Sequence, residues 1–387
     1  MMRVKNVETF ERILLAPSMV VCLFLIGCRN NSVARYDRET GDSAKSEYDP
    51  AISGYNRAVE ISPDDAGAYY NRGNAYNREG EYERAISDYD SALEINPKFY
   101  KAYYNRGVAY FNKGEYDLAI SDFTRAIEIN PKFAEAYSNR GIAYDAKGQI
   151  DLAISDFTSA IEISPEFAKA YYNRGNAYDN KGESNLAISD YTQAIEINPE
   201  DVKSYNNRGS VYNRKGDYDR AVSDYDKALE INPEYADAYY NRGLAYNRKG
   251  QYDLSLSDYN KALGIDPNNI DAYYNRGLAY SKKGEYDRAI SDFTSVIEIK
   301  PGYDKVYVDR GISYGKKGKY DLAILDFSKA IEIDPMCAKA YNDRAVGYYN
   351  KGEYDRAWDD VHKVQGLGYQ VYPGFLEALR EASGREK

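Results

Sequence analysis

One set of polar side chains in this chain recurs at a single spacing, and most of its members are amides. Asparagine occupies seven positions that lie 34 residues apart: Asn71, Asn105, Asn139, Asn173, Asn207, Asn241 and Asn275. Aspartate takes the next two places in the series, as Asp309 and Asp343. A side-chain amide offers N–H donors and an acceptor oxygen, so a row of amides suits an extended peptide backbone. The same amides could instead bond to neighbouring parts of the chain, and the sequence leaves both roles open.

Acid–base and metal chemistry have little support in the sequence. His362 is the only histidine, so the commonest general base is missing from almost the whole chain. No cysteine or serine nucleophile lies near it in the sequence, and its neighbours Asp359 and Asp360 follow the 34-residue spacing. There is no P-loop, no dinucleotide fingerprint and no zinc-type spacing of Cys and His. We therefore predict that the chain is not an enzyme and that it binds neither a cofactor nor a metal.

A unit of two helices, repeated every 34 residues, would position these side chains. Proline recurs at this spacing in nine places: 63, 97, 131, 165, 199, 233, 267, 301 and 335. A constant period of this length indicates stacked supersecondary units with one continuous core. We count repeat positions from the starts of nine full repeats at residues 66, 100, 134, 168, 202, 236, 270, 304 and 338.

Small and aromatic residues keep their places within the repeats. Positions 4 and 11 are always Tyr, and position 8 is Gly except in the last repeat, which has Ala345. Position 24 is Tyr or Phe, except for Val361 in the same last repeat. We expect the small residues to let two helices approach closely while aromatic rings fill the space beside them. Glycine at position 15 of every repeat is expected to end the first helix in a left-handed conformation.

Over residues 48 to about 370, this pattern resembles the tetratricopeptide repeat family. The resemblance implies an all-α fold, a right-handed α–α superhelix that binds proteins or peptides on its concave face. It divides this part of the chain into a half repeat at 47–65, nine repeats at 66–372, and a capping helix with a tail at 373–387. In the capping helix we expect Phe375, Leu376 and Leu379 to face the last repeat.

By the same resemblance, positions 2, 5, 6, 9, 12 and 13 of the first helices line the concave face. The Asn series lies at position 6, and tyrosines at position 5 add aromatic surface: Tyr70, Tyr104, Tyr172, Tyr240 and Tyr274. Packed helices lie about 8–10 Å apart and an extended chain advances about 3.3 Å per residue. One Asn per repeat would therefore meet about every third residue of a bound chain.

Charge on the predicted concave face differs in sign from charge on the whole chain. The formal net charge is −10, which argues against nonspecific binding to nucleic acid. Basic side chains such as Lys203, Arg214 and Arg248 nevertheless outnumber acidic ones at the predicted face. This balance favours acidic partners, which such a face would attract.

One departure from the family pattern is repeated nine times. The family usually has Leu at position 7 and Tyr at position 23, but here the pair is Arg and Asp in every repeat. Three examples are Arg72 with Asp88, Arg174 with Asp190, and Arg242 with Asp258. We predict that each pair forms an ion pair, either between the two helices of one repeat or across a repeat joint, with a structural role.

The N-terminus predicts export and lipidation. Arg3, Lys5 and Arg12 precede a mostly apolar run at 13–27, which is short for a membrane span and suits a signal peptide. The run ends in Leu-Ile-Gly followed by Cys28, which resembles a bacterial lipobox. That resemblance implies cleavage after residue 27 and acylation of Cys28, followed by a polar tether at 28–46. Several acyl chains on one residue would anchor the protein stably.

These observations predict a membrane-anchored scaffold that binds proteins or peptides in its concave groove. Because Arg29, and not aspartate, follows Cys28, the lipoprotein resemblance favours the outer membrane, facing the periplasm; anchoring to the inner membrane is the alternative. A peptidoglycan- or glycan-binding envelope protein is the alternative function, because Tyr beside Asn also suits a sugar chain. An enzyme with an unrecognised site is a remote third reading.

Overall fold

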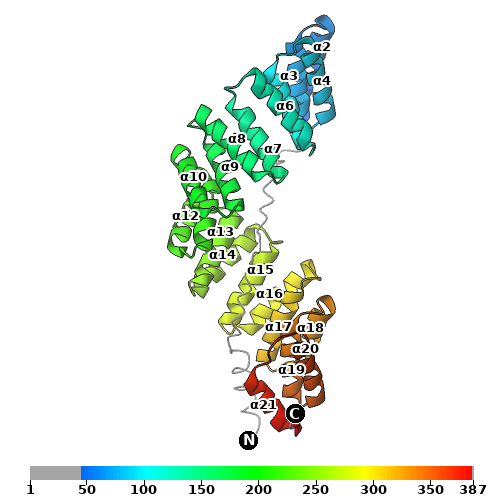
Figure 1. The fold of residues 1–387 in the computed structure, drawn as a ribbon, viewed down its shortest axis with the longest axis vertical. Coiled ribbons are helices and arrows are strands. Elements are labelled where there is room, and N and C mark those ends of the chain that lie inside the picture. Colours follow the sequence, from blue (N-terminus) through cyan, green and yellow to red (C-terminus); the bar gives the residue numbers. More distant parts are fainter. Residues whose placement is uncertain (1–44, 386–387) are drawn as a thin grey trace. The chain divides into compact units, whose positions relative to one another are not determined.

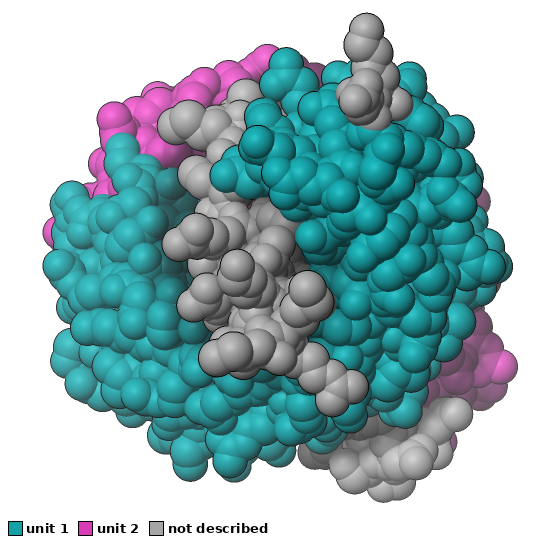
Figure 2. Space-filling model, turned by 90° about the horizontal axis from the view of Figure 1, so that it is seen from below, with its two compact units in different colours: residues 1–24, 212–387 teal, residues 25–211 magenta. Residues whose placement is uncertain are grey.

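A computed structural model describes residues 45–385 of the chain, with side chains from residue 51 onward. The described residues form 20 helices and no strand, so the predicted all-α repeat fold is confirmed. The chain divides within one helix into two compact units, at residues 211 and 212. We call the described residues 45–211 the N-terminal unit and the described residues 212–385 the C-terminal unit; Figures 1 and 2 show both.

The N-terminal unit begins with a single helix and continues with helix pairs. Its helices are α2 Lys45–Ile61, α3 Ala66–Arg78, α4 Tyr82–Ile95, α5 Tyr100–Asn112, α6 Tyr116–Ile129, α7 Ala134–Ala146, α8 Ile150–Ile163, α9 Ala168–Asn180 and α10 Ser184–Ile197. Helix α11, Val202–Arg214, contains the division between the units. The helix of the half repeat starts at Lys45, two residues inside the predicted tether.

The C-terminal unit continues the same pairing and ends with one extra helix. Its helices are α12 Tyr218–Ile231, α13 Ala236–Arg248, α14 Tyr252–Ile265, α15 Ile270–Lys282, α16 Tyr286–Ile299, α17 Asp304–Lys316, α18 Tyr320–Ile333, α19 Ala338–Lys351, α20 Tyr354–Gly366 and α21 Pro373–Ser383. In α21, Phe375 and Leu379 are fully buried against the last repeat and Leu376 packs beside them, as predicted for a cap.

Glycine at position 15 turns the chain from the first helix of each repeat to the second. All nine of these glycines have a positive φ, between 70° and 81°. After α5, Gly114 donates its N–H to the carbonyl of Phe111 and Glu115 donates to that of Tyr110, both at 2.9 Å. A left-handed residue at this place satisfies the last carbonyls of the helix, so the predicted role is confirmed.

The core consists of small residues that face aromatic rings across each helix pair. Ala153, Ala160 and Ala177, for example, have no exposed surface. A Cβ built on Gly277 would lie only 2.7 Å from Cε1 of Phe293, which is itself fully buried. In the last repeat the residues at positions 8 and 24 change together: Ala345 replaces the glycine and Val361 replaces the aromatic residue. The glycine at position 8 is therefore required by the ring at position 24.

Replacing Gly277 with alanine is expected to destabilise the C-terminal unit by about 1–3 kcal/mol, because the new methyl group overpacks against Phe293. The same replacement should cost clearly less in a Phe293→Val background, which reproduces the pairing of the last repeat. A double-mutant cycle in urea measures this coupling. Equal costs of Gly277→Ala in the two backgrounds would contradict the explanation.

The predictions about the N-terminus lie outside the described residues. These are the signal peptide at 1–27, the acylated Cys28 and most of the tether at 28–46. Within the part of the chain that the structure describes, no helix combines the length and the apolar composition needed to span a bilayer.

Candidate functional site

The first helices of the repeats line the concave side of each unit. In the N-terminal unit α3 contacts α5, α5 contacts α7 and α7 contacts α9; in the C-terminal unit the series α13, α15, α17 and α19 does the same. Second helices of neighbouring described repeats have no comparable contacts. When the helices on one side of a stack lie closer together than those on the other side, the stack curves toward the closer side. We call positions 2, 5, 6, 9, 12 and 13 of the first helices the inner face.

The asparagines of the inner face bond to the tyrosines of the preceding repeat. Nδ2 of Asn139 donates to the hydroxyl oxygen of Tyr104 at 2.8 Å, and Nδ2 of Asn105 donates to that of Tyr70 at 3.1 Å. The same contact joins Asn207 to Tyr172 at 3.2 Å and Asn275 to Tyr240 at 3.1 Å. Position 6 therefore helps to hold neighbouring repeats together, which was one of the two roles that the sequence left open.

These bonds fix the orientation of the amides. Asn105, Asn139 and Asn207 remain half-buried. Nδ2 of Asn105 also donates to Oδ1 of Asn74 at 2.7 Å, and Nδ2 of Asn207 also donates to Oδ1 of Asn176 at 3.0 Å. In α3 the first of the series, Asn71, is exposed, and within the described residues α2 is the single helix before it. Asn241 also has a partner. A ligand along the inner face would thus meet amides that are already oriented by the fold.

The contact is broken where position 5 is not tyrosine. Ser138 replaces the tyrosine before Asn173, and Nδ2 of Asn173 is then buried without a hydrogen-bond partner. Val308 replaces it before Asp343, and Oδ2 of Asp343 is likewise buried without a partner. A buried polar atom without a partner costs about 1–3 kcal/mol. These two places are the weak points of an otherwise regular series.

The tyrosine rings of position 5 are largely occupied by other rings of the chain. Tyr70 lies 4.8 Å from Phe99 between ring centroids, and Tyr104 lies 4.8 Å from Phe133. Tyr274 packs on Phe293 and on Tyr303 at 6.0 and 5.5 Å. Tyr172 and Tyr240 pack in the same way on Tyr191 and Tyr259. Their ring faces are therefore committed to packing within the repeat.

In eight repeats the arginine of position 7 holds the two helices of its own repeat together. In one repeat Nε of Arg174 contacts Oδ2 of Asp190 at 2.7 Å, and its NH2 group contacts Oδ1 at 2.9 Å. Arg72 with Asp88 and Arg242 with Asp258 form the same two-point pair. Asp190 is only 5% exposed, and its hydrogen bond raises the pKa of Arg174. Of the two predicted arrangements, the structure shows the pair within a repeat.

Each guanidinium also makes a third bond, which sequence reasoning missed. NH1 of Arg174 donates to Oγ1 of Thr158 in the preceding repeat at 3.0 Å. Position 25 supplies this acceptor as Asn56, Asp90, Thr124, Thr158, Thr192, Asp226, Asn260, Thr294 and Ser328. The residue type varies, but every member of the set carries a side-chain oxygen. That shared property was the available signal. The arginine therefore joins two helices of its own repeat to the repeat before it.

The predicted basic residues of the inner face differ in their surroundings. Lys203 is exposed near the start of α11. Arg248 donates to the backbone carbonyl of Asn213, 35 residues earlier, at 3.1 Å, so it also bridges neighbouring first helices. Arg214, in the last turn of α11, has a partner of its own. The structure does not gather these charges into one site.

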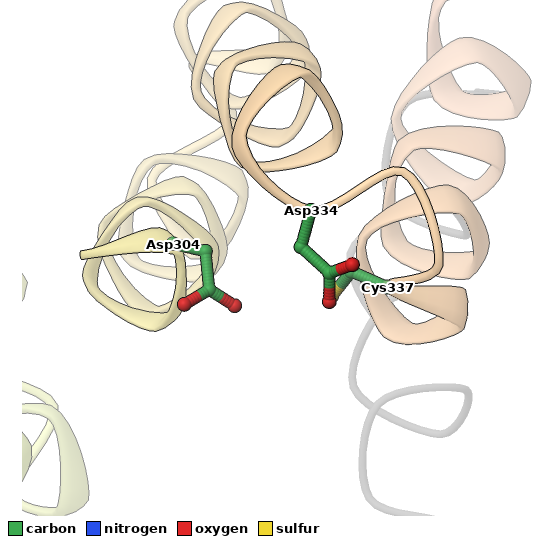
Figure 3. Close-up of side chains that lie close together, drawn as sticks. All are labelled: Asp304, Asp334 and Cys337. Carbon is green, nitrogen blue, oxygen red and sulfur yellow. The ribbon is translucent and has the colours of Figure 1, made fainter. Parts of the chain in front are cut away.

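One group of side chains among the described residues is close enough to share a metal ion. The ligand atoms of Asp304, Asp334 and Cys337 all lie within 4.8 Å of one another, at the ends of α17, α18 and α19, as Figure 3 shows. Burial, with a further contribution from both carboxylates, raises the pKa of the Cys337 thiol. A metal would need the thiolate, which these surroundings disfavour at neutral pH. We assign no metal site to this group.

His362 lies on the exposed side of α20 and stacks on Trp358, with 5.7 Å between the ring centroids. No nucleophile contacts it among the contacts that the structure describes. The inner face, and not an acid–base group, is therefore the candidate functional site.

Comparison with family models matches almost all of the described repeats. A model described as TPR repeat matches residues 44–79, 73–114, 143–182, 209–250 and 243–284. Two models described as tetratricopeptide repeat match residues 100–133, 168–201, 270–303 and 305–337, and residues 123–155 and 190–223. Together the matches extend over 44–303 and 305–337.

Several solved structures are similar to this chain. The C-terminal part of a TPR repeat-containing protein from Cytophaga hutchinsonii is 20% identical, with a TM-score of 0.52, and the match covers 62% of this chain and 98% of that one. A tetratricopeptide repeat protein from Parabacteroides merdae is 24% identical, with a TM-score of 0.49 and coverage of 64% and 98%. YrrB, described as a TPR protein with an unusual peptide-binding site, is 30% identical, with a TM-score of 0.43 and coverage of 48% and 95%. A search of the curated proteins found no significant match.

Proposed function

We propose that this chain, which belongs to the tetratricopeptide repeat family, binds an extended segment of another protein along the inner face of its repeats. Proteins built from these repeats are protein-binding scaffolds, and they are typically not enzymes. The observation that carries the proposal is the row of amides at position 6 in seven consecutive repeats. Four of them, Asn105, Asn139, Asn207 and Asn275, are held by a tyrosine of the preceding repeat. Such a row offers polar contacts at regular intervals to a chain that has its own repeating donors and acceptors.

The packing of the tyrosines favours a peptide over a glycan. A sugar chain would need free ring faces on which to stack, but Tyr70, Tyr104 and Tyr274 are packed against other rings. A peptide needs mainly hydrogen-bond partners for its backbone, and the oriented amides supply them. The preference for acidic partners, which the charge of the inner face suggests, stays a prediction.

Selection from a library of displayed random 15-residue peptides tests the proposal, with the full chain as bait. We expect peptides to be enriched, and Asn173→Ala to weaken binding of the selected peptides about fivefold, the equivalent of one hydrogen bond of about 1 kcal/mol. This variant should not lower the melting temperature, because the buried Nδ2 of Asn173 has no hydrogen-bond partner to lose.

Two control variants make the test specific. Asn207→Ala breaks the bonds to Tyr172 and Asn176 and should lower the melting temperature. Leu152→Ala, on a second helix and 48% exposed, should leave peptide affinity unchanged. Equal affinity of wild type and Asn173→Ala would count against binding at the amides. Retention of peptidoglycan fragments with no enriched peptide would favour the glycan alternative.

We further propose that the scaffold is anchored in the bacterial cell envelope through acylated Cys28, with the outer membrane as the expected location. The support is the resemblance of residues 13–28 to a lipoprotein signal. Cells given an alkyne analogue of palmitate should label the wild-type chain and not Cys28→Ser. Equal labelling of the two would show that Cys28 is not the acylated residue.

A further inference from the structure

The inner face of the last repeat contains a carboxylate that the fold does not neutralise. Asp343, on α19, is only 4% exposed. Its Oδ1 accepts a hydrogen bond from Nδ2 of Asn342 at 3.1 Å, while Oδ2 is buried without a partner. Burial raises the pKa of Asp343 to about 6, and the charge of Asp309 adds to the effect. At neutral pH the site therefore holds a buried negative charge with incomplete compensation, which is costly.

The sequence change that produces this charge is local to the last two repeats. Position 6 is asparagine in the seven repeats before and becomes Asp309 and then Asp343. Before Asp343 the tyrosine that would donate to it is replaced by Val308, which is 3% exposed. A neutral asparagine at this position would avoid the cost of burying a charge. A buried charge that destabilises the fold at such a position indicates a binding role.

Asp309 presents the second negative charge on the neighbouring first helix, α17. Its Oδ2 accepts a hydrogen bond from the hydroxyl of Tyr274 at 2.7 Å, and its Oδ1 lies 3.6 Å from Nζ of Lys339. The Asp309 side chain is 17% exposed, and the Lys339 side chain is 60% exposed. Lys339 also attracts Asp343 electrostatically. A long, exposed cationic side chain thus occupies this place in the free protein.

We propose that the pair Asp309 and Asp343 receives the cationic end of a lysine or arginine side chain of the bound segment, which displaces Lys339. Asp309 would contact the incoming cation, and Asp343 would attract it from the buried side. A hard metal ion needs six or more oxygen ligands or an ordered set of waters, whereas only one carboxylate oxygen is unpaired here. An ammonium or guanidinium group brings several N–H donors and fits two carboxylates on adjacent helices.

This inference rests on the proposed peptide binding, and the same peptide selection tests it. We expect the enriched peptides to share a lysine or arginine at one fixed position. Replacing that residue by norleucine should weaken binding to the wild-type chain at least tenfold, because norleucine keeps the apolar stem and loses the charge. Asp343→Asn and Asp309→Asn should reduce this difference to less than threefold. Both variants place asparagine where seven other repeats carry it, so they should fold.

Asp271→Asn is the matched control. It removes the same charge from an exposed position of the inner face, one repeat before Asp309, and should keep the tenfold preference. Enriched peptides without a shared basic residue would overturn the inference while leaving peptide binding intact. An unchanged preference in Asp343→Asn and Asp309→Asn would do the same. If no peptide is enriched at all, the proposed function fails, and this inference fails with it.

Discussion

Replacing Asp190 with alanine is expected to destabilise the N-terminal unit by about 3–5 kcal/mol, the usual cost of breaking a buried ion pair from one side. Asp190 is 5% exposed and binds Arg174 through both carboxylate oxygens. Without it, a guanidinium whose side chain is 16% exposed would keep only Thr158 as a hydrogen-bond partner. The helices α9 and α10 would lose their main polar link, so their amides should exchange hydrogen faster than those of distant repeats.

The exposed ion pairs of the same repeats provide the control. Asp151 pairs with Nζ of Lys181 at 2.9 Å, but its side chain is 86% exposed. Asp151→Ala should therefore leave the melting temperature essentially unchanged. If Asp190→Ala and Asp151→Ala shift the melting temperature equally little, the arginine pairs do not stabilise the stack.

Replacing Asp343 with asparagine is expected to stabilise the C-terminal unit at neutral pH and to leave it unchanged in acid. The pKa of Asp343 is raised to about 6 by burial, whereas an aspartate in the unfolded chain titrates near 4. The folded state thus favours the protonated form. The contribution of protonated Asp343 to the free energy of unfolding is fully present below about pH 4, and it is lost as the pH rises through about 6.

The expected size of this effect at pH 7.5 is about 3 kcal/mol in favour of Asp343→Asn, since each pKa unit corresponds to about 1.4 kcal/mol. The groups facing Asp343 are Lys339 and Asn342 on its own helix and Asp309 on α17. Trp358, the only tryptophan, lies on α20 in the last repeat and reports its unfolding by fluorescence. Urea unfolding of the wild type and of Asp343→Asn between pH 4.5 and 7.5 measures the difference between their free energies of unfolding. A difference that stays constant with pH would contradict the raised pKa of Asp343.

Features that repeat in the sequence were predictable, because a side chain present in every repeat has the same surroundings each time. The glycine turns followed from position 15, and the link between Arg174 and Asp190 followed from two charges that replace an apolar pair. The capping helix followed from Phe375 and Leu379, which continue the apolar spacing beyond the last repeat. For these residues the 34-residue repeat pattern was enough to predict the structural role.

Other features depend on side-chain geometry that the period does not determine. The third bond of Arg174 goes to Thr158, at a position where Thr, Asp, Asn and Ser share only an oxygen atom. The asparagines of position 6 could bond to a ligand or to a neighbour, and only the orientation of Asn139 toward Tyr104 showed the second contact. The unpaired atoms at Asn173 and Asp343 arise from the preceding repeat, at Ser138 and Val308, so neither is visible at its own position.

The most direct test of binding on the inner face is a crosslink from a selected peptide that carries a benzophenone group at successive positions along its length. Proteolysis and mass spectrometry of the full chain then locate each attachment. We predict attachment to first helices, and a shift of the attachment site by one repeat for about every third peptide residue, as the helix spacing requires. Attachment to second helices such as α8 and α10, or to one fixed place for all peptide positions, would show that the inner face is not the binding site.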